Sequence, residues 1–156
     1  MHSLTRRTSI KLIAVVAAFA VAVPAASAAS ARKDSGTAYV SVTHQEGSTL
    51  WVAGDIKDKI LGRGAIVYQT KVSAGQQTGS VLVTAKTVTL FTPTGSLTGT
   101  GKATQTANPD GSITVTGGVV SLTKGTGSLK GHSLKATFSG PFKDNIYTFK
   151  YSGTYK

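Results

Sequence analysis

Apolar residues alternate with polar ones through much of this chain, and this period of two limits the fold more than any other feature. Ala38, Val40 and Val42 alternate with hydroxyl-bearing residues, and the pattern recurs from Leu134 to Ser139. Successive side chains of a strand point to opposite faces, so the alternation predicts strands with one buried face. No segment sustains the i, i+3, i+4, i+7 apolar spacing of an amphipathic helix. The chain is therefore predicted to be all-β.

Turn residues divide the pattern into eight segments. Asn108-Pro109-Asp110-Gly111, Gly75 to Gly79 and Asp144-Asn145 are typical of turns between strands. Eight antiparallel strands in one small domain favour a closed β-barrel, which leaves no exposed edge, over the alternative of a β-sandwich. Because the chain ends on a strand, that strand is expected to pair with an early one. The predicted strands are 38–43, 49–53, 63–72, 80–91, 96–106, 112–122, 133–139 and 145–155.

Two of these segments change phase within a single run. The apolar positions of one run are Val81, Val83 and Ala85, and then Val88 and Leu90. A second run switches at Gly117-Gly118, between Val115 and Val120. Since a shift of one residue exchanges the two faces of a strand, each switch predicts a β-bulge or a sharp bend.

The first 29 residues resemble an export signal. Arg6, Arg7 and Lys11 precede an apolar run from Leu12 to Val23, and Ala26-Ser27-Ala28 fits an A-x-A cleavage site. The apolar run is shorter than the roughly 20 residues that a membrane-spanning helix needs. The predicted organisation is an export signal over 1–29, a flexible lead-in over 30–36 and a single β-barrel domain over 37–156.

Export by the general secretory route is favoured, although the Arg6-Arg7 pair also resembles a twin-arginine signal. We expect a protein that is secreted or held in the cell envelope. Protein recovered outside the cell should therefore lack residues 1–28 or nearby, which N-terminal sequencing would detect. An intact segment from Met1 to Val23 on the secreted form would contradict this prediction.

Charge and composition narrow the partners and the chemistry. Beyond residue 29 the chain has 14 basic and 6 acidic residues, a net charge of +8 spread over all segments. Specific nucleic-acid binding is not expected from so even a distribution, whereas anionic cell-envelope polymers are candidate partners. The absence of cysteine excludes disulfides and thiol catalysis. His44 and His132 lack carboxylates at metal-ligand spacing, so no metal or cofactor is expected.

The first candidate site is acidic and has two interpretations. Asp55 and Asp58 lie in a charged segment that precedes Arg63. The favoured interpretation is a solvated loop between strands. The alternative is a pocket rim, where an Asp acts as acid or base and Arg63 binds an anionic group.

The second candidate site is an aromatic strand face. Tyr147, Phe149, Tyr151 and Tyr155 share one side of the last strand by alternation. Because burying the intervening Lys150 without a partner would be costly, the aromatic side is expected to face inward. The four rings either fill the barrel or line a pocket for one small ligand. Further aromatic candidates for either arrangement are Tyr39, Trp51 and Tyr68.

The run from Val120 to Gly131 resembles the Gly-Thr-Gly-x-hydrophobic signature of the dirigent and allene oxide cyclase barrels. Lys124 replaces the usual first glycine, and Leu129 replaces phenylalanine. Leu61-Gly62-Arg63-Gly64 is similar to an apolar-Gly-Arg segment of that family. The segment from Tyr151 to Tyr155 looks like the end of exported bacterial relatives.

The resemblance implies an eight-stranded antiparallel barrel with a central cavity, often trimeric. Plant members of the family steer phenoxy radicals or cyclise an epoxide in that cavity. Only Asp55 and Asp58 stand in a region comparable to that of the family's acidic catalytic residues, so no catalytic residue is assigned.

Three functional hypotheses remain. The favoured one is a non-enzymatic exported barrel that binds a small apolar or aromatic molecule. The second is a dirigent- or cyclase-type enzyme or guide, and the third is a structural or envelope-associated protein with a filled barrel. An open interior would separate the first two from the third, and an acid facing the cavity would separate the second from the first.

Overall fold

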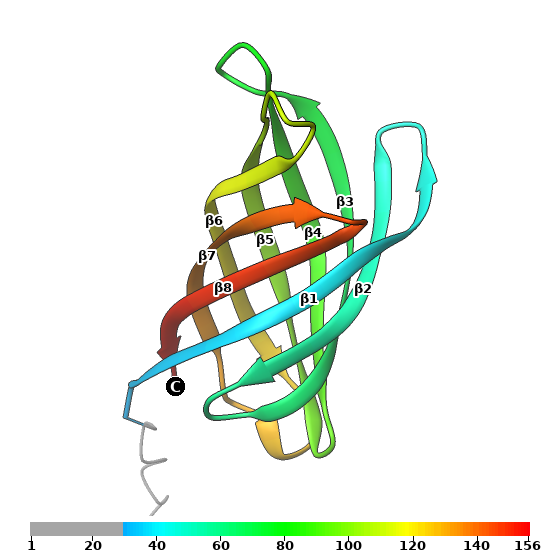
Figure 1. Ribbon diagram of the computed structural model, residues 1–156. Helices are drawn as coiled ribbons and strands as arrows, with labels where there is room; N and C mark the ends of the chain where they lie inside the picture. The colour runs from blue at the N-terminus through cyan, green and yellow to red at the C-terminus, as the bar shows by residue number, and fades with distance from the viewer. Residues whose placement is uncertain (1–29) are drawn as a thin grey trace, which may run out of the picture.

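Eight antiparallel strands joined by short connections make up residues 30–156, which are the residues that the computed structural model describes. Each strand pairs with the next in the chain, and the last pairs with the first, so the sheet closes into a barrel (Figure 1). The predicted all-β class and closed barrel are confirmed, and the alternative sandwich is not formed. The predicted export signal over 1–29 lies outside the described residues. The strands are β1 (Arg32–Glu46), β2 (Thr49–Asp58), β3 (Gly62–Ala74), β4 (Ser80–Thr92), β5 (Gly95–Ala107), β6 (Ile113–Gly125), β7 (Leu134–Lys143) and β8 (Ile146–Tyr155).

The barrel closes along β1 and β8, which lie side by side in Figure 1. Their register runs from Arg32 opposite Tyr155 to Val40 opposite Tyr147. This corrects the predicted flexible lead-in over 30–36, because β1 begins at Arg32, pairs with β8 from there and is paired on both sides from Gly36 to Val40. The polar run before Ala38 carries no apolar alternation, but its backbone is held by the far end of β8.

A second correction concerns β2, which continues through Asp58. The charged segment beginning at Asp55, expected as a loop, is mostly strand and pairs with β1 and β3. Only the three residues 59–61 separate β2 from β3. Asp55 and Asp58 are therefore held by a paired backbone, and strand parity decides where each side chain points.

Both predicted phase switches are β-bulges. The β4–β5 register shifts between Ala85 and Val88, and the β6–β7 register shifts between Val115 and Gly118. All of Ala85, Val88 and Val115 are buried. Each bulge thus returns the apolar side chains to the interior after the change of phase.

Inward-facing side chains of all eight strands form one core. Its least exposed members are Val40, Leu90, Leu97, Val115 and Leu122. The described residues contain one short 3₁₀ helix, η1 (Gly127–Leu129), which follows β6 in the chain, contacts β5 and has Leu129 buried. No helix in this part of the chain has the length and apolar character needed to cross a membrane.

Candidate functional site

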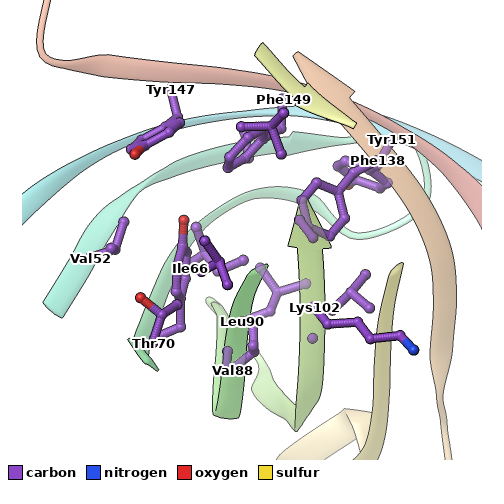
Figure 2. Close-up of a pocket in the computed structure, with 18 of the residues that line it drawn as sticks. Val52, Ile66, Thr70, Val88, Leu90, Lys102, Phe138, Tyr147, Phe149 and Tyr151 are labelled. Carbon is purple, nitrogen blue, oxygen red and sulfur yellow. The ribbon is translucent and has the colours of Figure 1, made fainter. Parts of the chain in front are cut away.

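The barrel interior holds a cavity of about 100 Å³ (Figure 2). Its walls are mainly aliphatic and aromatic, and every strand contributes to them. No Asp or Glu of residues 30–156 lines it. Typical small-molecule pockets span about 300–1,000 Å³, so this interior is filled for the most part and the space that remains is small. The lining residues are Ala38, Leu50, Val52, Ile56, Ile66, Tyr68, Thr70, Val83, Ala85, Val88, Leu90, Gly101, Lys102, Ala103, Gln105, Val115, Val120, Leu122, Leu134, Phe138, Tyr147, Phe149 and Tyr151.

The aromatic face of β8 points inward, as its alternation predicts. Tyr147, Phe149, Tyr151 and Tyr155 are all buried, while Lys150 is exposed on the outer surface. The first three line the cavity. Tyr155 lies beyond it, where its ring stacks on His132 with 5.1 Å between ring centroids. The aromatic face of β8 therefore fills one end of the barrel and also forms part of the wall of the remaining space.

Of the three further aromatic candidates Tyr39, Trp51 and Tyr68, only Tyr68 lines the cavity. Tyr39 faces outward and is 43% exposed, and Trp51 packs against His44 at a centroid distance of 4.8 Å. The opposite parities of Tyr39 and the inward-facing Ala38 and Val40 explain why Tyr39 cannot contribute to the interior.

Asp58 is the one predicted acidic residue that the fold brings to the aromatic face. The Tyr151 hydroxyl donates a hydrogen bond to Asp58 Oδ2. Asp58 Oδ1 accepts hydrogen bonds from the backbone N–H groups of Ile60 (2.7 Å) and Leu61 (2.6 Å), which fixes the turn into β3. The hydrogen bond between Tyr151 and Asp58 requires glycine at position 36, because a Cβ there would overlap the Tyr151 hydroxyl.

Asp55 and Arg63 are not part of this arrangement. Both are exposed on the outer surface of the barrel, on β2 and β3. Asp55 pairs with Ala65 across the β2–β3 ladder, and Arg63 pairs with Lys57. Of the three residues considered for a pocket rim, only Asp58 is buried on the inner side of the barrel.

Asp34, which the sequence analysis assigned to the lead-in, is buried beside Asp58. Its Oδ1 accepts a hydrogen bond from the Ser35 N–H at 2.8 Å, and its Oδ2 is buried without a hydrogen-bond partner. Burial and the neighbouring Asp58 carboxylate raise the pKa of Asp34 to about 6. The Asp34 carboxyl group therefore keeps its proton to a higher pH than an exposed aspartate does.

The burial of Asp34 could have been predicted from the alternation of inward and outward side chains along β1. Counting back from the buried Ala38 and Val40 in steps of two gives Gly36 and Asp34 on the same inward face. Neither acid lines the cavity, because the Tyr151 ring does so on that side. The Asp34–Asp58–Tyr151 group therefore closes the barrel at the end where β1 begins and β2 and β8 end.

A second polar group, which the sequence analysis missed, lies on the cavity itself. Thr70, Gln105 and Tyr147 line it, together with Tyr68. Gln105 Nε2 donates a hydrogen bond to the Tyr147 hydroxyl oxygen at 3.3 Å. Thr70 is buried, and its Oγ1 has no hydrogen-bond partner. Burial raises the pKa of both tyrosine hydroxyls, which therefore stay protonated as donors at neutral pH.

Lys102 brings no charge into this space. Its carbon chain contributes to the lining, while its amine points away from the side of the cavity where Thr70 and Tyr147 lie (Figure 2). Among residues 30–156, no three or more His, Cys, Asp and Glu side chains are gathered as metal ligands would be.

Comparison of the chain with protein-family models, with curated proteins and with solved structures gave no match. The barrel, its cavity and the two polar groups are the features of the molecule that bear on its function.

Proposed function

We propose that this protein is a non-enzymatic binding protein that holds one small, mainly apolar molecule inside its barrel. The observation that carries the proposal is the cavity of about 100 Å³ with aliphatic and aromatic walls. A mainly apolar space of this size attracts apolar guests, as engineered cavities of about 150 Å³ that bind benzene or xenon illustrate. By proportion, the present cavity suits a guest of about four non-hydrogen atoms.

The volume of the cavity limits the size of the ligand that the sequence predicts. A ring as large as benzene exceeds the space, so an aromatic ligand would have to displace the side chains of the wall. We further propose that the protein acts after export, which the basic and apolar segments within residues 1–29 support.

Catalysis of the dirigent or cyclase type has less support. The eight-stranded closed barrel is the architecture that the family resemblance implies, and it favours that relationship. General acid–base chemistry, however, requires a titratable group within hydrogen-bond reach of the substrate. The nearest carboxylates, Asp34 and Asp58, do not line the cavity.

The experiment is to fill the cavity from within. Ala103 is buried on β5 and lines the cavity, so Ala103→Leu adds three carbon atoms to the space that a guest would occupy. Xenon binding, followed by ¹²⁹Xe NMR, is expected in the parent protein and should be lost or weakened at least about tenfold in the variant.

The matched control is Ala65→Leu, which adds the same atoms at an exposed position on β3. Xenon binding to this variant should equal that of the parent. The binding function would be refuted if the parent took up no xenon, or if Ala103→Leu bound it as well as Ala65→Leu.

A further inference from the structure

The feature that the proposed function leaves unexplained is the side chain of Thr70. It is 3% exposed, and its hydroxyl oxygen has no hydrogen-bond partner. Most buried side-chain polar atoms have at least one partner, and an unsatisfied one costs stability. Valine would fill the same volume on β3 without that cost. A threonine in this place therefore indicates a polar partner that comes from outside the protein.

The side chains around Thr70 indicate which chemical groups such a partner would meet. Tyr68 precedes it by two residues on the same inward face of β3, and Tyr147 reaches the same part of the cavity from β8. In Figure 2 the oxygen atoms of Thr70 and Tyr147 lie on the same side of the cavity. The Tyr147 oxygen already accepts from Gln105, so its own O–H remains available to donate.

Resting on the proposed function, we infer that the guest is a neutral molecule with a short hydrocarbon body and one oxygen-bearing head group, such as an alcohol or a ketone, which binds to Thr70. The aliphatic wall around Val88 and Leu90 encloses the body of this molecule, and the hydroxyl groups of Thr70 and Tyr147 bind its oxygen. The guest is uncharged, because no carboxylate of the described residues lines the cavity and the Lys102 amine points away from it.

The test compares 2-propanol, which has four non-hydrogen atoms and one hydroxyl, with xenon, which forms no hydrogen bond. Both are titrated into the full domain and followed by NMR. Thr70→Val removes the hydroxyl and keeps the shape of the side chain. We expect this variant to bind 2-propanol roughly threefold to tenfold more weakly than the parent, as the loss of one hydrogen bond implies, and to bind xenon as well as the parent does.

Two controls complete the experiment. Thr84→Val makes the same change at an exposed position on β4. It should alter neither the affinity for 2-propanol nor the affinity for xenon. The melting temperature of Thr70→Val should equal or exceed that of the parent, because its hydroxyl has no partner in the protein. A lower melting temperature would show that the hydroxyl is needed by the fold, which would overturn the inference.

The possible binding results separate the two proposals. Xenon binding without 2-propanol binding, or equal 2-propanol affinity in Thr70→Val and the parent, would overturn the head-group inference and leave the apolar cavity standing. If neither probe binds, the proposed function fails as well, and Thr70 is satisfied by trapped water alone.

Discussion

Replacing Tyr151 by alanine should lower the free energy of unfolding by about 3–5 kcal/mol, as for other large aromatic truncations in a core. The ring is buried and forms part of the cavity wall, and its hydroxyl is bonded to Asp58. Its removal merges the space left behind with the existing cavity, so part of the interior loses its contacts. Chemical denaturation followed by circular dichroism measures this difference, provided that the slope with denaturant is unchanged.

Two further variants separate the causes of this loss. Tyr151→Phe keeps the ring and leaves Asp58 Oδ2 without its donor, which should cost about 1–3 kcal/mol. Tyr39→Ala truncates a tyrosine that is 43% exposed on the outer face of β1, and it should stay within about 0.5 kcal/mol of the parent. Equal losses for the alanine variants of Tyr151 and Tyr39 would contradict the inward placement of the aromatic face.

Stability should fall as the pH rises from about 4 to about 6, because of Asp34. Its folded-state pKa is about 6, against an ordinary value of 3.8, so the folded protein holds this proton more tightly than the unfolded chain does. The stabilisation is therefore complete below about pH 4 and is lost as the pH passes through the folded-state pKa. Each unit of pKa separation corresponds to about 1.4 kcal/mol. Burial is the main cause of the raised pKa of Asp34, the charge of Asp58 adds to it, and the hydrogen bond from the Ser35 N–H opposes it.

Asp34→Asn isolates this contribution. The amide carries no charge at any pH and leaves no charge buried beside Asp58, so the variant should exceed the parent in melting temperature above pH 6. The difference between the two should shrink toward pH 4. Asp55→Asn, an exposed carboxylate on β2, serves as the control and should keep the pH profile of the parent. An Asp34→Asn variant that is less stable than the parent at pH 7 would show that the buried charge of Asp34 does not destabilise the fold.

Strand parity explains both what the sequence predicted and what it did not. The alternation and its two phase switches led to the eight strands and both bulges, because each of these features is local. The aromatic face of β8 was placed correctly for the same reason, with Lys150 excluding the opposite orientation. Asp55 and Asp58 are three residues apart, so a strand must direct them to opposite faces, but this constraint applies only once the segment is known to be strand.

The remaining site residues depend on partners that are distant in the sequence. Asp34 is buried because β8 and β2 reach the start of β1. No pattern in the sequence next to Asp34 predicts that pairing. Thr70 continues the inward parity of Ile66 and Tyr68, but threonine is common on both faces of strands. Only the closed barrel shows that its hydroxyl faces a void. Export, anionic polymer partners and a trimeric assembly stay predictions.

The pairing of β1 with β8 also determines how the molecule can be made. Arg32 and Tyr155 stand opposite each other although more than a hundred positions separate them along the chain. Until β8 is available, a growing chain has two open strand edges and an uncovered apolar face, which is a state prone to association with other chains. Folding is therefore expected on the slow, millisecond-to-second scale of proteins dominated by distant contacts. The same adjacency of the first and last strands means that a short linker can join them. The chain can then be reopened at the Asn108–Gly111 turn, giving a circular permutant with the same barrel.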